Sequence, residues 1–242
     1  IAYKGTQYAG FQSQQNAHNT IQEEIENALS ILLRTKIPVT GASRTDAGVH
    51  ARQNFVHLDI DLLLPDNFLY KINALLPGDI VIKNFYPVTD DKHARFDAVS
   101  RSYEYIIYTK KDPFIKEFAY FYPYKISFEN LQQAAESLFL YEDFTSFSKR
   151  NTQVKTFNCT ILHAAWTKNN ERLYFNITAN RFLRGMVRGL VGTMLKAGRQ
   201  KITVEEFKQI IENKDCTKAD FSAPPQGLFL CEVKYPEDIF GK

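Results

Sequence analysis

Cysteine is scarce in this chain, and no cysteine pair has the spacing of a functional motif. Its three cysteines, Cys159, Cys216 and Cys231, are an odd number and lie far apart, and no Cys-x-x-Cys pair occurs. This spacing excludes a zinc ribbon and a thioredoxin-like redox motif. A reducing compartment is the simplest setting for such a chain, so we expect a cytoplasmic protein. His50 and His57 fall in one region without metal-ligand spacing, and we expect no metal site.

Long apolar runs and a strong excess of one charge are also missing. No apolar stretch approaches the roughly 18 residues of a membrane helix, and no secretory signal is visible, so we expect no membrane partner. The net charge of +3 is weakly basic. It is compatible with a nucleic-acid partner but does not establish one, because the distribution of charge matters more than its sum. The 242 residues, 44% of them hydrophobic, suffice for one large domain or two small ones.

Helical and strand patterns are mixed along the whole chain. A capping box at Thr20–Glu23 precedes apolar residues at helical spacing, and a second box occurs at Thr203–Glu206. Strand patterns with hairpin signals favour antiparallel pairing, which predicts an α+β fold. Helices are expected from residue 21, over 67–75, 127–140 and 181–197, and after residue 203; strands are expected over 55–60, 80–85, 102–109, 160–167, 173–179 and 228–235.

A polar stretch over 87–100 is typical of a connector. We therefore divide the chain into an N-terminal half, 1–96, and a C-terminal half, 97–242. No internal repeat is convincing at the level of sequence.

The run Ser43-Arg44-Thr45-Asp46-Ala47-Gly48-Val49-His50 concentrates chemical groups where no apolar periodicity demands them. An arginine two residues before Asp46 favours its ionised carboxylate. Ala47 and Gly48 leave the side of the loop open to a bulky substrate. The run also has an ordinary interpretation, a surface turn with an Arg–Asp pair.

At about 100° per residue, four arginines in and just after the expected helix over 181–197 fall within one narrow arc. Glycines border this arc, although a glycine in a helix interior costs roughly 1 kcal/mol. Close approach of another group to that face would explain them, whereas an ordinary solvated face is the alternative. The arginines are Arg181, Arg184, Arg188 and Arg199, and the glycines are Gly185, Gly189 and Gly192.

Taken together, these runs resemble the TruA family of tRNA pseudouridine synthases. Family members usually read Gly-Arg-Thr-Asp-Ala-Gly-Val-His where this chain has Ser43 in place of the first glycine. The opening segment departs twice, with Lys4 where the family usually has Asp and Phe11 where it usually has Trp. The matching segments, in the family's order, are 3–12, 42–51, 73–80, 93–98, 101–105, 182–188 and 227–230.

The resemblance implies an architecture and a set of partners. It implies two similar α+β halves that share a mixed, largely antiparallel sheet with a central basic cleft. It further implies a homodimer that binds tRNA. The expected reaction is the isomerisation of uridine to pseudouridine at positions 38, 39 and/or 40 of the anticodon stem-loop, for which no cofactor is needed because nothing is oxidised or added.

The resemblance also assigns roles to single residues. Asp46 is the expected catalytic nucleophile; attack at the ribose C1′, attack at C6 of the base and removal of a ribose proton all stay open on the residues alone. Arg188 is expected to pair with Asp46, and Arg44 to help displace the base. Tyr103 is expected to stack on the flipped uracil, against the apolar wall of Leu228.

The remaining site residues are expected to contact the RNA. Arg181 and Arg184 are assigned to phosphates, whereas His50 is either structural or faces the RNA.

Two other functions remain open. A non-catalytic RNA-binding protein on the same scaffold is the main alternative, although Asp46 together with Arg44, Tyr103 and Arg188 favours an enzyme. An aspartic-protease-type hydrolase is the second, because Asp46-Ala47-Gly48 resembles an Asp-Thr-Gly loop. That chemistry needs two copies of the loop sharing a proton, and this chain contains one copy, so a homodimer would have to supply the other.

Overall fold

The computed structural model describes residues 1–14, 18–61, 63–150 and 154–240, and the chain divides into two compact units. The first unit comprises Ile1–Val99 and Leu230–Lys242, and the second comprises Ser100–Phe229. Each unit combines helices with strands, so the α+β class expected from the sequence is confirmed.

The C-terminal segment belongs with the first unit, whereas the sequence-based division at 96/97 placed it with the C-terminal half. Hydrogen bonds explain this return. The Arg52 N–H donates to the Leu230 carbonyl at 2.8 Å, and the Val99 N–H donates to the Lys234 carbonyl at 2.8 Å. Strand β10 (Leu228–Lys234) thus begins in the second unit and ends in the first.

The first unit is built from two-residue strands. β1 (Ala2–Tyr3) pairs antiparallel with both β3 (His50–Ala51) and β5 (Ile80–Val81), and β2 (Thr40–Gly41) pairs antiparallel with β4 (Val56–His57). The longer strands predicted over 55–60 and 80–85 are therefore wrong in extent.

An asparagine side chain accounts for the early end of β5. The Ile82 N–H donates to Oδ1 of Asn73 at 2.8 Å, and Nδ2 of Asn73 donates to the Ile82 carbonyl at 2.8 Å. Both backbone groups of Ile82 are satisfied by this side chain, so they are not available to a sheet ladder.

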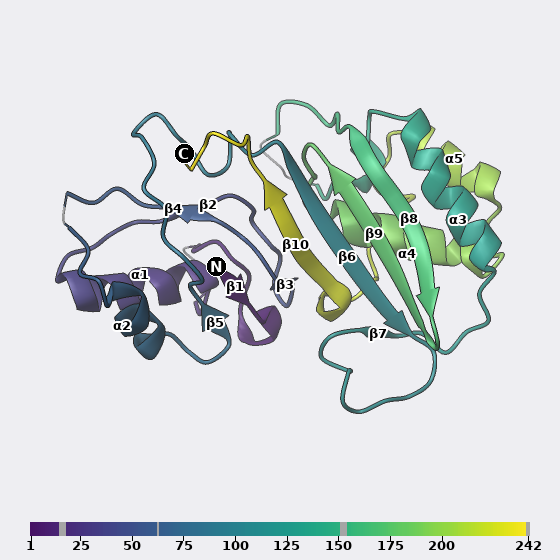
Figure 1. Cartoon of the computed structure of the whole chain (residues 1–242). Helices are drawn as coiled ribbons and strands as arrows, with labels where there is room; N and C mark the ends of the chain where they lie inside the picture. The colour runs from purple at the N-terminus through teal and green to yellow at the C-terminus, as the bar shows by residue number, and fades with distance from the viewer. Residues whose placement is uncertain (15–17, 62, 151–153, 241–242) are drawn as a thin grey trace. The chain divides into compact units, whose positions relative to one another are not determined.

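Two helices complete the first unit. α1 (Ile21–Leu33) begins at the predicted capping box, in which Thr20 and Glu23 each satisfy a backbone N–H of the other. Its buried residues include Ile25 and Leu29, as the helical spacing predicts. α2 (Phe68–Leu75) begins after Asn67, and it packs against α1 (Figure 1).

The second unit contains a longer antiparallel sheet. β6 (Ser100–Tyr108) pairs with β9 (Arg172–Ala179), β9 pairs with β8 (Ile161–Asn169), and β7 (Tyr120–Phe121) pairs parallel with β6. The predicted hairpin of 160–167 with 173–179 is confirmed. Residues alternate between buried and half-exposed along β9, so one face of this sheet is packed and the other is open.

Helices cover the packed face (Figure 1). They are α3 (Phe128–Ser137), α4 (Met186–Gly198) and α5 (Val204–Glu212). The sequence predicted α3 up to residue 140, but its last three residues form a 3-10 turn. The capping box of α5 at Thr203 and Glu206 is confirmed. Among the described residues, 3-10 turns are formed by Gly5–Gln7, Leu138–Leu140, Thr145–Phe147 and Pro225–Gly227.

Helix α4 begins at Met186, five residues later than predicted. Gly185 has a φ of 75°, which is left-handed and cannot belong to a right-handed helix. Arg181 and Arg184 consequently lie on the segment before the helix, and Arg199 is its C-cap. The predicted arc of four arginines along one helix is therefore wrong.

The glycines of α4 are explained by the chain itself. A Cβ built at Gly192 would lie 2.2 Å from the carbonyl oxygen of Asp220, and one at Gly189 would lie 2.8 Å from the ring of Phe221. The close approach inferred from these glycines is thus made by segment 220–221, which packs on the helix.

We expect Gly192→Ala to destabilise the second unit by about 1–3 kcal/mol despite the better helix propensity of alanine, because the Asp220 backbone has to move. Urea unfolding followed through the fluorescence of Trp166, the only tryptophan and a buried residue of β8, measures this. The control is Gln209→Ala at an exposed position of α5, expected to stay within about 0.5 kcal/mol of wild type. Equal stability of the two variants would contradict the packing argument.

Candidate active site

Asp46 begins a tight turn in the first unit. The Val49 N–H donates to the Asp46 carbonyl at 3.1 Å, and Gly48 has a φ of 76°. A left-handed residue at this third position is what a type II turn requires. Asp46 is half-buried and Ala47 is exposed, so the turn holds the carboxylate beside small residues at the surface.

The opening segment of the chain packs directly on the backbone of this turn. The Phe11 N–H donates to the Thr45 carbonyl at 3.0 Å. Gly10 has a φ of 115°, and a Cβ there would lie 3.0 Å from the Thr45 carbonyl oxygen and 3.3 Å from the Ala47 nitrogen. Only glycine combines this backbone angle with this close approach. The position of the Asp46 turn therefore depends on Gly10.

A buried hydrogen-bond network holds the residues on either side of Arg44. Oη of Tyr3 and Oγ1 of Thr45 lie 2.8 Å apart, and Nδ2 of Asn54 donates to the Ser43 carbonyl at 3.0 Å. Burial raises the pKa of Tyr3 to about 12, so its phenol stays neutral as a hydrogen-bonding group. The backbone of the run is thereby fixed while the Arg44 side chain is exposed.

Arg44 and His50 have opposite environments. The exposed Arg44 makes no ion pair with Asp46 or with any other residue in the described part of the chain, so the Arg–Asp surface pair is absent. His50 is 1% exposed, and its Nδ1 accepts a hydrogen bond from the Gly5 N–H at 3.1 Å. Of the two roles expected for His50, these surroundings support the structural one and not contact with RNA.

In the second unit, Tyr103 lies on β6 opposite Ile177 of β9, and directly opposed residues share a face of the sheet. That face is the helix-covered one. Tyr103 is only half-buried, whereas Tyr105 is completely buried and donates from Oη to the Pro224 carbonyl at 2.7 Å. The Tyr103 ring contacts the ring of Phe182 edge-on, with centroids 5.1 Å apart. Tyr105 is therefore a core residue, and Tyr103 lies at the border of the core beside the segment that precedes α4.

Arg188 lies in the first turn of α4. Its Nε donates to the Ala223 carbonyl at 2.7 Å, which fixes the direction of the guanidinium group. The residue is half-buried. A planar guanidinium held at one nitrogen presents its other donors in a fixed fork, the geometry that suits a carboxylate.

The other expected residues of the second unit lie around the start of α4 and the start of β10. Arg184 is exposed and Arg181 is half-buried; the Lys149 N–H donates to the Arg184 carbonyl at 3.0 Å. Leu228 is 6% exposed and follows Gly227, where a Cβ would lie 2.8 Å from the Tyr105 ring.

Sequence reasoning missed the residues that position the site without touching a substrate. Gly10 and the Ala223 carbonyl both act through the backbone, and residue types give little indication of backbone contacts. Gly10 falls within the matching segment 3–12, but its residue type alone does not indicate this role. Within the described ranges, no group of three or more His, Cys, Asp or Glu side chains could hold a metal ion.

Comparison with known proteins identifies the family. The family model described as tRNA pseudouridine synthase matches residues 1–97 and 134–236. A tRNA pseudouridine synthase A of Parabacteroides distasonis is 48% identical over 99% of this chain and 96% of its own length. One from Bacteroides thetaiotaomicron is 48% identical over 100% and 91%, and one from Bacillus subtilis is 40% identical over 97% of both chains.

The chain belongs to the tRNA pseudouridine synthase family. The resemblance inferred from the sequence is thereby confirmed, and with it membership of a family of isomerases. The matched ranges of the synthase family contain every candidate residue except Tyr103, which lies between them.

Two departures from the usual synthase sequence are accommodated by packing. Ser43 is buried and its backbone is not left-handed, so a side chain fits where relatives usually have glycine. Phe11 is 1% exposed, and a Cβ at Gly41 would lie 2.2 Å from its ring. The smaller aromatic ring therefore fills the space over Gly41.

We expect Gly10→Ala to loosen the Asp46 turn and to destabilise the first unit by about 1–3 kcal/mol, because alanine is strained at this angle and meets the Thr45 carbonyl. Amide hydrogen exchange on peptides covering 41–51 should become faster. The control is Gly78→Ala, where an added Cβ meets nothing within 4 Å. Unchanged exchange in Gly10→Ala would show that the turn holds itself.

Proposed function

We propose that this protein isomerises uridine to pseudouridine at positions 38, 39 and/or 40 of the tRNA anticodon stem-loop, with Asp46 as the catalytic nucleophile. The observation that carries the proposal is the Asp46 turn, a half-buried carboxylate on a backbone that two independent segments hold in place. Membership of the tRNA pseudouridine synthase family supplies the substrate class.

The chemistry suits a single carboxylate. The reaction breaks the bond between ribose C1′ and N1 of uracil, rotates the base, and joins C1′ to C5, which then loses its hydrogen as a proton. Nothing is oxidised and no group is added, so no cofactor is required. A covalent intermediate on Asp46 divides this rearrangement into two easier steps. Water has to be kept away, since it would otherwise hydrolyse the bond.

The remaining residues would prepare the carboxylate and the base. Arg188, oriented by the Ala223 carbonyl, is proposed as the ion-pair partner of Asp46. Tyr103 is half-buried and able to stack on an extruded uracil, and Leu228 is proposed as the apolar wall of the base pocket. Arg44 is exposed on a fixed backbone, which suits a side chain that displaces the base from its stack.

The same proposal covers the wider setting of the enzyme. A tRNA-modifying isomerase of this family is proposed to act in the cytoplasm and to form a homodimer around its substrate. Arg181 and Arg184, on the segment before α4, are proposed to contact phosphates, and His50 supports the loop from within. No helix in the described part of the chain is long and apolar enough to cross a bilayer.

The first test measures tritium release from tRNA transcripts labelled at uridine C5. Wild-type protein should release tritium, and Asp46→Asn should lower the rate by roughly 10³-fold or more while tRNA still binds. The product is mapped by carbodiimide-dependent primer-extension stops, expected at positions 38, 39 or 40. Full activity of Asp46→Asn would end the mechanistic claim. Binding without release from any tRNA would favour a non-catalytic RNA-binding protein.

A second test addresses the arginines before α4. Arg184→Ala and Arg181→Ala should each weaken tRNA binding and reduce the slope of log affinity against log salt by about one, because each lost phosphate contact releases one counterion fewer. Fluorescence anisotropy over a salt series measures this. An unchanged slope would return these arginines to an ordinary surface role.

A further inference from the structure

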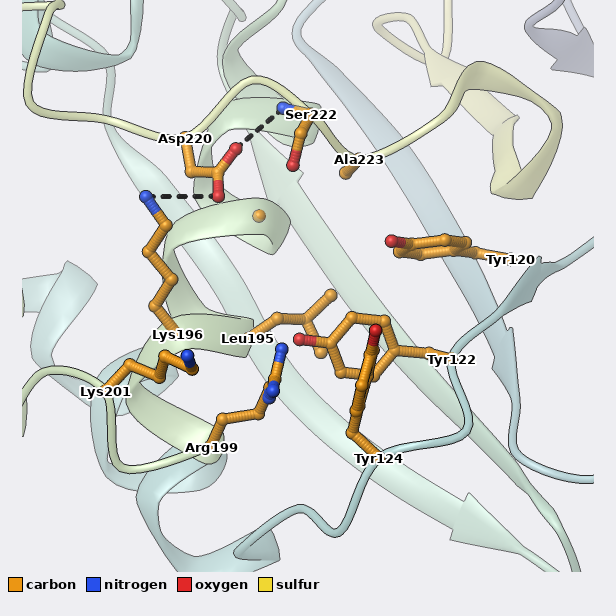
Figure 2. A pocket seen from close by; sticks show the side chains of 11 residues that line it. Tyr120, Tyr122, Tyr124, Leu195, Lys196, Arg199, Lys201, Asp220, Ser222 and Ala223 are labelled. Carbon is orange, nitrogen blue, oxygen red and sulfur yellow. Dashed lines mark hydrogen bonds and ion pairs between the residues drawn. The ribbon is translucent and has the colours of Figure 1, made fainter.

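The second unit contains a pocket of about 330 Å³ beside the C-terminal end of α4 (Figure 2). Three tyrosines that follow β6 form one wall, cationic side chains of α4 and the residues after it form another, and segment 220–223 closes a third side. Leu195 and Gly192 of α4 also line it. None of the roles proposed above uses this pocket.

The tyrosine wall consists of Tyr120, Tyr122 and Tyr124. Alternate residues of an extended segment point to one side, and the Tyr122 N–H extends the pairing with β6 by donating to the Tyr108 carbonyl at 2.9 Å. Neighbouring rings are 5.3 Å and 4.9 Å apart between centroids. Tyr122 is buried, whereas Tyr124 is 48% exposed, so the outermost ring is accessible to a ligand.

The cationic wall is fixed by the way α4 ends. Gln200 is left-handed, the Lys201 N–H donates to the Lys196 carbonyl at 2.9 Å, and the Gln200 N–H donates to the Ala197 carbonyl at 2.9 Å. These two bonds make a Schellman motif. The motif turns the chain back at the end of the helix and brings Lys201 to the same pocket as Lys196 and Arg199.

One carboxylate faces these cations and neutralises only one of them. Asp220 accepts from Nζ of Lys196 at 3.2 Å and from the Ser222 N–H at 2.8 Å. Although burial opposes it, these bonds hold the pKa of Asp220 below its usual value, so the group is ionised. Arg199 and Lys201 form no ion pair with any acid in the described ranges. The positive charge of the pocket is therefore concentrated at its Arg199–Lys201 end.

Arg199 is held against the tyrosines. Its guanidinium carbon lies 3.8 Å from the ring centroid of Tyr124 and 6.0 Å from that of Tyr122. These contacts hold the guanidinium group at the tyrosine wall of the pocket, where it can attract an anion.

We infer that this pocket binds a nucleotide of the substrate RNA other than the one that reacts, with a phosphate at Arg199 and Lys201 and a base against Tyr124. A pocket that combines unneutralised cations with an accessible aromatic ring is the kind of arrangement that binds single-stranded nucleic acid. The inference rests on the proposed function in one respect, namely that the substrate is tRNA.

The position along α4 agrees with a second contact on the same RNA. Arg199 follows Arg188 by eleven residues, which is about 16 Å along a helix axis. The Ala223 that orients Arg188 also lines the pocket. A strand that reaches Arg188 therefore has to cover only a few nucleotides to reach Arg199.

The test compares tRNA binding by Arg199→Ala/Lys201→Ala with that of a matched control. Both proteins carry Asp46→Ala so that no turnover occurs. The control, Lys111→Ala/Lys168→Ala, also removes two cations; both of these lysines are exposed, and neither lines the pocket. We expect the pocket variant to bind full-length tRNA about tenfold more weakly, with a salt slope lower by about two, and the control to remain near wild type.

Further variants separate binding from folding. Lys201→Glu changes an exposed side chain and should weaken tRNA binding more than Lys201→Ala, without lowering the Tm. Tyr124→Phe, which keeps the ring, should bind as wild type, whereas Tyr124→Ala should bind several-fold more weakly. In the active background the pocket variants should raise KM for tRNA and leave kcat unchanged.

Binding of Lys201→Glu at wild-type strength, or equal binding of the pocket double variant and the control, would overturn the inference. Its failure differs from failure of the proposed function. If only the pocket inference fails, wild-type protein releases tritium while the pocket variants bind tRNA normally. If only the proposed function fails, the pocket variants bind tRNA weakly, but wild-type protein releases no tritium.

Discussion

The contact between Gly10 and the backbone of the Asp46 turn is the constraint on which the candidate site depends. A turn of four residues with a left-handed glycine is adaptable by itself, and a carboxylate on it would point in many directions. Backbone packed on backbone removes this freedom, because neither surface has side chains that can yield. The buried bonds of Tyr3 and Asn54 then fix the residues before the turn. Rigidity of this kind is what a catalytic group needs, since misplacement by 1 Å can cost a hundredfold in rate.

In the second unit, too, a segment packs closely where glycines leave space. Segment 220–223 approaches α4 where Gly189 and Gly192 have no side chain, and it contributes groups in two directions. The Ala223 carbonyl orients Arg188, and the Asp220 carboxylate neutralises Lys196. One short stretch thereby connects the candidate catalytic arginine with the tyrosine-lined pocket. Both links are polar contacts made by a segment that also packs on the helix.

The sequence predicted the features that local rules determine. Capping boxes, the hairpin of β8 with β9, and the helical spacing of α1 were all visible in residue types at fixed distances. The predicted start of α4 is wrong because helical spacing takes no account of backbone angles. The left-handed Gly185 falls within the expected helix for that reason. Strand β5 was predicted too long because the competing acceptor, Asn73, lies in another element. The candidate site was found through its motif, while its supports at Gly10 and Ala223 required the structure.

Net charge was the least informative number in the sequence, and the ion pairs show why. Lysines that form an ion pair contribute little to the electrostatic field around the protein, because the nearby acid compensates their charge. Those paired in the second unit are Lys110, Lys196, Lys208 and Lys214. Arg184, Arg199 and Lys201 form no ion pair in the part of the chain that the structure describes. A protein with a net charge of +3 can therefore present strongly cationic places to a polyanion. The positions of cations without a nearby acid, rather than an overall excess of lysine, can therefore allow a protein of low net charge to bind RNA in one orientation.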